Sequence, residues 1–96
     1  MEYIITMAYR IFLKKKVLKI LLQLPEQARK RFEILYKVLE LSGPSGPHYW
    51  QNYGKLGENK YHCHLNYHYV ACWQHEKGTI TIEVYYVGSR ENAPYA

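Results

Sequence analysis

The spacing of apolar residues changes once along this chain of 96 residues, from a helical period to a strand period. In the first half, apolar side chains recur every three or four residues in two blocks, which predicts two amphipathic helices. The two apolar faces consist of Val17, Ile20, Leu21 and Leu24, and of Ala28, Phe32, Leu35 and Leu39. Pro25 separates the blocks and is expected to begin the second helix, since a first turn tolerates proline. The glycine- and proline-rich run at residues 42–47 then ends that helix.

The second half of the chain alternates apolar and polar residues, which is the period of strands. Strands are expected at residues 61–66, 67–73 and 79–87, with a short extended piece at 53–56 and an earlier strand at 9–12. In the last strand, Ile80, Ile82, Val84 and Tyr86 are expected to share one face. Helices followed by consecutive strands are typical of α+β domains. We therefore predict one domain over residues 1–96, with residues 1–8 as a candidate extension and two helices on a mostly antiparallel sheet of about four strands.

Charge and cysteine content limit the classes of partner and compartment. Lysine and arginine number 13 against 8 acidic residues, so the formal net charge is +5. That charge favours RNA, DNA or an acidic protein, although many small basic domains bind no nucleic acid. Cys63 and Cys72 lie in apolar runs and are expected to be reduced, packed thiols. No segment has the length of a membrane span or the pattern of a signal peptide, so we expect a cytoplasmic protein without a membrane partner.

The run Tyr-His-Cys-His-Leu at residues 61–65 is the strongest candidate for chemistry. In a strand, His62 and His64 project from one face, and Tyr61, Cys63 and Leu65 from the other. His68 begins the next extended run, where a short turn can bring it back toward the pair. Imidazole titrates nearest neutral pH and can both accept and donate a proton. The histidines therefore suggest acid–base chemistry on an anionic substrate, although a histidine on an exposed strand is more often a solvated surface residue.

A metal site is the alternative interpretation of the same histidines. His-x-His on a strand places two imidazoles on one side, and His68 could be a third ligand. Cys63 should face away from them, and the chain has no CxxC or HExxH motif. We therefore expect neither a metal nor a cofactor.

Several short motifs follow one another in a specific order along the chain. They are Leu-Ser-Gly-Pro at 41–44, Trp50, Tyr-Gly-Lys-Leu at 53–56, the histidine run, Tyr-Val-Ala-Cys-Trp at 69–73, the segment 83–91 and Ala-Pro-Tyr at 93–95. This series resembles the RelE/ParE superfamily of bacterial toxins from toxin–antitoxin pairs, in particular the RelE-like cytotoxic translational repressors. The resemblance covers nearly the whole chain from about Tyr9. It implies two N-terminal helices on a curved antiparallel sheet, and an endoribonuclease that cuts mRNA, commonly in the ribosomal A site.

The resemblance also implies where the catalytic residues lie. RelE-type toxins carry two basic residues where this chain has His62 and His64, and an arginine at the head of the next strand, where His68 stands. A further arginine matches Arg90, and a tyrosine near the C-terminus matches Tyr95. Because histidines replace lysines and an arginine, individual roles cannot be copied across. We expect His62 or His64 as the base, Arg90 as a phosphate clamp, and His68 or Tyr95 as an acid or a stacking partner.

Basic and aromatic residues near these positions are candidates for binding RNA. They are Trp50, Lys55, Lys60, Lys14, Lys15 and Lys16. The lysine run is more often a solvated helix start, and Trp50 is at least as well suited to cover the edge of a core.

Two functions of other classes compete with mRNA cleavage. One is a ParE-like inhibitor of DNA gyrase, which acts by binding and needs no catalytic histidines. The other is a non-catalytic module that binds an antitoxin in repressor complexes. The His-x-His pair with Arg90 favours the nuclease. The expected partners are a cognate antitoxin, mRNA and the ribosome, with a monomer when free and a hetero-oligomer with an antitoxin whose acidic residues meet the positive charge.

Overall fold

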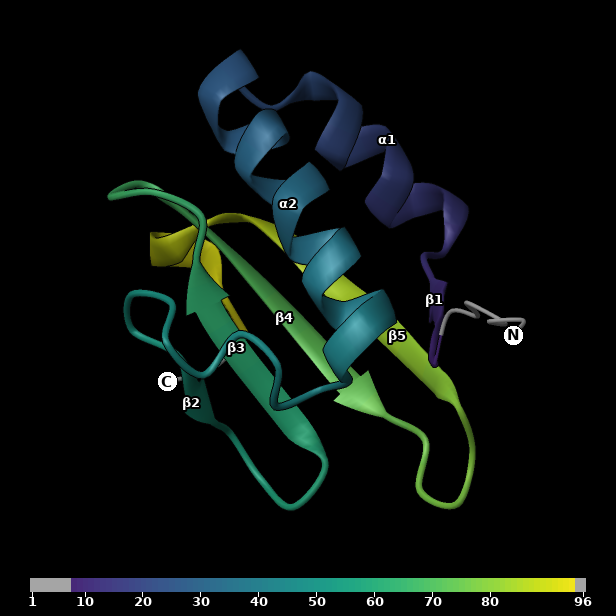
Figure 1. The fold of residues 1–96 in the computed structure, drawn as a ribbon. Coiled ribbons are helices and arrows are strands. Elements are labelled where there is room, and N and C mark those ends of the chain that lie inside the picture. The colour runs from purple at the N-terminus through teal and green to yellow at the C-terminus, as the bar shows by residue number, and fades with distance from the viewer. Residues whose placement is uncertain (1–7, 95–96) are drawn as a thin grey trace, which may run out of the picture.

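The computed structural model describes residues 8–94 and has an α+β architecture (Figure 1). Two helices, α1 (Lys15–Gln23) and α2 (Glu26–Ser42), lie on one face of a five-stranded sheet. The strands are β1 (Arg10–Phe12), β2 (Gly54–Lys55), β3 (Lys60–His64), β4 (Tyr69–His75) and β5 (Thr81–Ser89), and a 3₁₀ turn, η1 (Arg90–Asn92), follows. The predicted fold class is thus confirmed, with five strands where about four were expected.

The order of the strands brings distant parts of the chain together. The sheet runs β1-β5-β4-β3-β2, with β1 parallel to β5 and all other pairs antiparallel. β1, which precedes the helices, forms one edge of the sheet and pairs with β5, the last strand. Their register is fixed by Ile11 opposite Ile82, and the Arg10 amide donates to the Ile80 carbonyl over 2.7 Å. This pairing places α1, which follows β1 directly, alongside β5.

The core lies between the helices and one face of the sheet. All four apolar positions predicted for α2 are buried, and Trp73 from the centre of β4 is fully buried beneath that helix layer. The Trp73 ring stacks on Tyr61 with 6.0 Å between ring centres, and its indole Nε1 donates to the Pro44 carbonyl over 3.1 Å. In α1, Val17 and Leu21 are buried while Ile20 is exposed, so its buried stripe is narrower than predicted.

The turn between β3 and β4 takes residues from both predicted strands. β3 ends at His64 and β4 begins at Tyr69, whereas the alternation pattern predicted strands that met at residues 66 and 67. The Asn66 carboxamide oxygen accepts hydrogen bonds from the amides of His68 and Tyr69, over 2.9 and 3.0 Å. Asparagine commonly closes a turn in this way, which stops the ladder early.

A β-bulge in the middle of β5 reverses which side chains of the strand point toward the core. Trp73 pairs with Val84 and Cys72 pairs with Tyr86, so Tyr85 is an extra residue opposite the step between them. An extra residue reverses the alternation beyond it, and the core receives Val87 instead of Tyr86. The prediction that Tyr86 shares a face with Ile82 and Val84 is therefore wrong. Ile80, the fourth predicted member of that face, is exposed and precedes the strand.

Other expectations concern single residues and the N-terminus. Cys63 and Cys72 are both free and buried, as predicted. Within residues 8–94, neither helix has the length and apolar character needed to cross a bilayer. The candidate N-terminal extension falls on residues 1–8, of which the structure describes only Ala8.

Candidate active site

The histidine pair lies on the side of the sheet that carries no helix, here named the helix-free face. Along β3, Tyr61 and Cys63 are buried in the core with the helices, so Lys60, His62 and His64 project from the opposite side. The predicted facing of the pair is thus confirmed. It follows directly from the alternation of side chains along a strand.

Cross-strand pairing arranges the helix-free face in rows. His62 lies opposite Gly54 on one side and Cys72 on the other, and Cys72 lies opposite Tyr86. The next row holds His64, Val70 and Gly88. Beyond the ends of the ladders, the Arg90 amide donates to the His68 carbonyl over 2.9 Å. Pairing therefore brings the three predicted histidines and Arg90 to neighbouring positions in three successive rows.

Charge couples His62, His64 and Arg90. Burial lowers the pKa of the His64 imidazole, and the nearby positive charge of Arg90 lowers it further. Burial also lowers the pKa of His62, with an additional contribution from His64. Burial first and neighbouring positive charge second disfavour the protonated imidazole, so the neutral form of both rings is favoured at neutral pH. The neutral form is the one that can accept a proton from a substrate.

A loop residue holds His64 in place. The Asn52 side-chain amide lies 3.3 Å from each ring nitrogen of His64, and the His64 backbone amide donates to the Gln51 carbonyl over 3.0 Å. Asn52 has a positive φ of 55°, a conformation that asparagine adopts more readily than most residues. Asn52 was not predicted as a site residue, because its contact with His64 depends on the path of the loop after α2.

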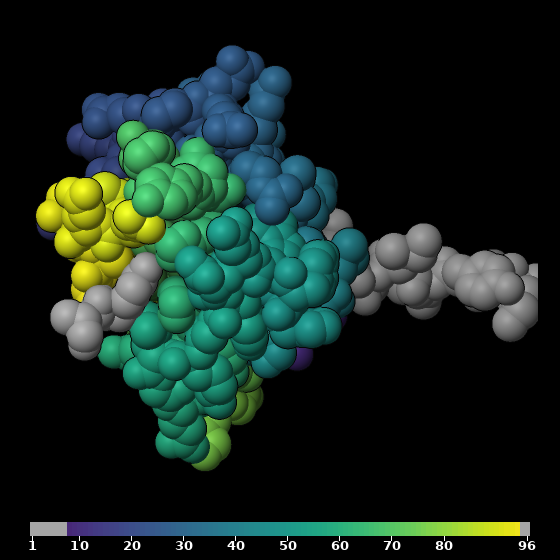
Figure 2. Space-filling view, turned by 90° about the vertical axis from the view of Figure 1, so that its left-hand side faces the viewer, coloured from purple at the N-terminus to yellow at the C-terminus, as the bar shows by residue number. Residues whose placement is uncertain are grey.

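Arg90 stacks on an exposed tyrosine at the edge of the face. Its guanidinium carbon lies 4.3 Å from the centre of the Tyr67 ring, and the Tyr67 side chain is 65% exposed. A cavity of about 270 Å³ opens here, lined by Tyr67, His68, Tyr69, Ser89, Arg90 and Glu91. Figure 2 shows the turn between β3 and β4, in green, next to the C-terminal turn, in yellow. The cavity lies where these two turns meet.

His68 belongs to this cavity and is exposed. Its ring contacts Tyr67 edge-on, with 5.0 Å between ring centres, and Tyr69 at 6.5 Å. The structure thus places His68 with Arg90, one row beyond His64. Tyr95, the remaining predicted catalytic residue, lies outside the described residues.

Some of the predicted RNA-binding lysines border the helix-free face. The Lys60 ammonium lies 5.8 Å from the centre of the Tyr85 ring. Lys14 and Lys16 line a cavity of about 340 Å³ together with Tyr85 and Tyr86. Lys15, the third lysine of the run, is exposed at the start of α1.

The structure places two other RNA-binding candidates elsewhere. Trp50 is only 7% exposed and closes the core, where the Arg31 guanidinium lies 4.3 Å from its ring centre. Lys55 pairs with Tyr61 in the sheet, and so it projects toward the helix side, with its ammonium 5.4 Å from the Tyr61 ring centre. Trp50 thus covers the edge of the core, its alternative role, and the role of Lys55 in binding RNA stays a prediction.

The bulge adds two tyrosines that sequence analysis missed. Burial raises the pKa of Tyr85 to about 12, and the Cys72 thiol beneath contributes to the raised pKa of both Tyr85 and Tyr86. The Tyr86 hydroxyl donates to the Ser89 carbonyl over 2.6 Å. A regular strand would send adjacent tyrosines to opposite faces, and no residue pattern in the sequence marks the bulge.

The side chains around the histidines offer no complete set of metal ligands within residues 8–94. Among residues 8–94, no group of three or more histidine, cysteine, aspartate or glutamate side chains is arranged to hold a metal ion. The three histidines thus do not form the metal site that was the alternative interpretation.

Comparison with known proteins identifies a similar fold. No protein-family model matches the sequence, and no curated protein matches it either. A solved structure is similar: a chain in the crystal structure of the archaeal RelE–RelB complex from Pyrococcus horikoshii OT3, with a TM-score of 0.71 and 22% sequence identity. The similarity covers 91% of this chain and 100% of that one. The protein therefore has a RelE-like fold.

Proposed function

We propose that the protein is the toxin of a toxin–antitoxin pair, and that it is a metal-independent endoribonuclease that cleaves mRNA at the ribosome and so inhibits translation. The main support is the coupled group of His62, His64 and Arg90 on the helix-free face of a RelE-like fold. Two neutral imidazoles beside a permanent cation are suited to a substrate that must lose a proton next to a phosphate.

The proposed reaction uses the nucleophile that RNA itself carries. His64 accepts the proton of a ribose 2′-hydroxyl, and the 2′-oxygen attacks the adjacent phosphorus. The bond from phosphorus to the 5′-oxygen breaks, and an acid delivers a proton to that departing oxygen. The products are a 2′,3′-cyclic phosphate and a 5′-hydroxyl, so atoms and charge balance without any further reactant.

The geometry favours particular residues for these roles. His64 is the preferred base because Asn52 holds its ring and Arg90 lies close enough to lower its pKa. Arg90 suits the phosphate, since a guanidinium can donate two parallel hydrogen bonds to phosphate oxygens. His68 is the proposed acid because it lines the same cavity as Arg90.

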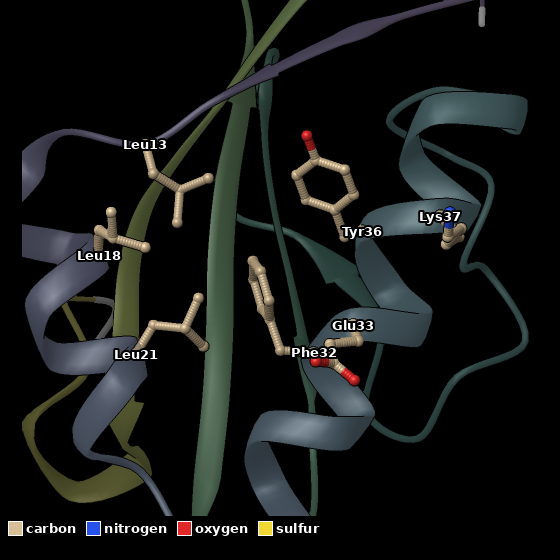
Figure 3. A pocket seen from close by; sticks show the side chains of 7 residues that line it. All are labelled: Leu13, Leu18, Leu21, Phe32, Glu33, Tyr36 and Lys37. Atoms are coloured by element: carbon tan, nitrogen blue, oxygen red, sulfur yellow. The ribbon is translucent and has the colours of Figure 1, made fainter.

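The antitoxin is proposed to bind on the helix side as well as over the active site. A cavity of about 470 Å³ lies between α1 and α2, lined by Leu13, Leu18, Leu21, Phe32, Glu33, Tyr36 and Lys37 (Figure 3). An amphipathic helix can place its apolar face in a groove of this kind. The structural neighbour is a RelE–RelB complex, which supports a protein partner for this chain too.

Primer extension on mRNA in a translating extract tests the nuclease. We expect the native protein to produce cuts within codons that require ribosomes. His64→Ala should lower cleavage by about 10²- to 10⁴-fold, the usual contribution of a general base. The matched control is His48→Ala. His48 is exposed, and its ring contacts the Ser45 carbonyl and the Tyr49 ring of its own loop. This control should cleave like the native protein.

Two results would contradict the proposal. Undiminished cleavage by a folded His64→Ala variant would remove His64 from the reaction. DNA breaks that depend on gyrase, without any cut in mRNA, would replace the nuclease by the ParE-like alternative. Circular dichroism of each variant shows whether the fold is retained.

A further inference from the structure

We propose that Tyr67 is a positioning residue of the site: its ring holds the Arg90 guanidinium beside His64 and keeps it away from the carboxylate of Glu91. This inference rests on the proposed nuclease function, and it assigns a role to an exposed side chain in the turn between β3 and β4.

The backbone on both sides of this contact is fixed. The Asn66 carboxamide oxygen accepts hydrogen bonds from the amides of His68 and Tyr69, which sets the path of the turn that carries Tyr67. The Arg90 amide donates to the His68 carbonyl over 2.9 Å, which ties the end of β5 to the same turn. The ring and the guanidinium therefore start from backbone positions that are joined by hydrogen bonds.

The contact itself holds the cation without neutralising it. The guanidinium carbon of Arg90 lies 4.3 Å from the centre of the Tyr67 ring, within the range of a cation–π interaction. An aromatic face attracts positive charge but carries no net negative charge of its own. Arg90 therefore keeps its full charge and its fork of N–H donors for the oxygens of a phosphate.

Glu91 is the competing partner for Arg90. It follows Arg90 in η1, and both side chains line the cavity of about 270 Å³ that also contains Tyr67 and His68. An ionised carboxylate pairs with a guanidinium through two parallel hydrogen bonds and occupies the donors that a phosphate needs. When the Tyr67 ring is removed, we expect Arg90 to turn toward Glu91 and away from His64.

His64 reports where the Arg90 charge lies. The positive charge of Arg90 contributes to the lowered pKa of His64, second to burial. A guanidinium that leaves the ring spends less time beside the imidazole, so the pKa of His64 should rise when the ring is lost. The Tyr67 ring itself contacts Arg90 and the His68 ring. Its effect on His64 is therefore expected to pass through Arg90.

The first test uses the free protein and no RNA. Tyr67→Leu removes the ring, Tyr67→Phe keeps it without the hydroxyl, and Tyr49→Leu removes a similarly exposed tyrosine, 68% against 65%, from the loop after α2. Nuclear magnetic resonance follows the Arg90 Nε–H signal, which the ring current of Tyr67 displaces, and the titration of the His64 imidazole. In Tyr67→Leu, we expect the displacement to disappear and the pKa of His64 to rise, by less than in Arg90→Gln. Tyr67→Phe and Tyr49→Leu should match the native protein.

The second test measures cleavage of mRNA on the ribosome as a function of toxin concentration. We expect Tyr67→Leu to lower the maximal rate about three- to tenfold, the size of effect that a lost cation–π contact produces, with the half-saturating concentration unchanged. Tyr67→Phe should restore the native rate, and Tyr49→Leu should retain it. Circular dichroism checks that each variant is folded.

The two tests together separate the possible failures. An unchanged Arg90 signal and His64 titration in Tyr67→Leu would overturn the positioning role, even if cleavage falls, because the ring would then act on the RNA directly. Native rates of cleavage in Tyr67→Leu would overturn it too. If the native protein cuts no mRNA while Tyr67→Leu shifts both signals, only the nuclease proposal fails and the positioning of Arg90 stands.

Discussion

His64 and Arg90 illustrate how two groups of the same charge can share a site. Arginine stays protonated at any pH that a protein meets, so the imidazole responds to the repulsion by releasing its proton more readily. The pKa of His64 is lowered accordingly, by burial first and by Arg90 second. The site therefore contains one permanent cation and one neutral proton acceptor at neutral pH.

Removing Arg90 should change the titration of His64 and the rate of cleavage together. In Arg90→Gln, we expect the pKa of His64 to rise, because the neighbouring positive charge is lost while burial remains. Cleavage should fall by about 10²-fold or more, the size of effect seen when a fixed donor to a developing charge is removed. Titration of the imidazole ring signals by nuclear magnetic resonance measures the pKa. Arg10→Gln, on the edge strand β1, serves as the control, and an unchanged His64 titration in Arg90→Gln would contradict the assignment.

At the scale of elements, β5 does most to shape the site. Its bulge at Tyr85 directs two consecutive tyrosines to the helix-free face and returns Val87 to the core. Gly88 then lets the Tyr86 ring lie across the strand, since a Cβ at Gly88 would come within 2.8 Å of the Tyr86 hydroxyl oxygen. The strand leads directly into η1, where Arg90 is the first residue.

A methyl group at Gly88 should displace Tyr86 without breaking the sheet. In Gly88→Ala, we expect the Tyr86 hydroxyl to lose its hydrogen bond to the Ser89 carbonyl, and the free energy of unfolding to fall by about 1 kcal/mol. Gly57→Ala is the matched control, because a Cβ there meets no atom within 4 Å. Urea unfolding compares the two variants with the native protein, and equal stability of all three would show that Tyr86 is not held in this way.

The whole molecule separates two kinds of surface. Helices and core occupy one side of the sheet, and His62, His64, Lys60 and Arg90 occupy the other, in a chain with a formal net charge of +5. Burial and positive charge on this face disfavour protonation of His62 and His64. Its histidines should therefore affect the stability of the fold as the pH falls.

We expect the protein to become less stable as the pH falls below about 6.5, the ordinary pKa of histidine. His62 and His64 have lowered pKa values in the folded state, so the unfolded chain binds more protons in the window between the two values. Excess proton binding by the unfolded chain lowers the free energy of unfolding as the pH decreases. Urea unfolding at about pH 7.5 and about pH 5.5 measures this loss. The double variant His62→Gln/His64→Gln should lose less stability over that interval, and an equal loss would contradict the prediction.

The sequence predicted the regular helices and strands well, but it predicted strand ends and the burial of loop residues poorly. The apolar faces of α2 and β3 were predicted because a regular period shows directly which side chains are buried. The early end of β3 was not predicted. It arises because the Asn66 carboxamide oxygen accepts hydrogen bonds from the His68 and Tyr69 amides, which ends the pairing with β4 before these residues. Trp50 was assigned to RNA by its position near a loop, whereas its burial depends on how that loop folds back over α2.

The amino-acid sequence by itself determined two helices, the strands that follow them, and the presence of His62 and His64 on one face, since these depend on periods of only a few residues. Tertiary structure alone decided that Arg90 lies beside His64, that Tyr85 and Tyr86 share a face, and that Lys55 turns away from the site. Each of these depends on which strands pair and in what register. Pairing between distant segments is governed by the packing of the whole core, which no local pattern encodes.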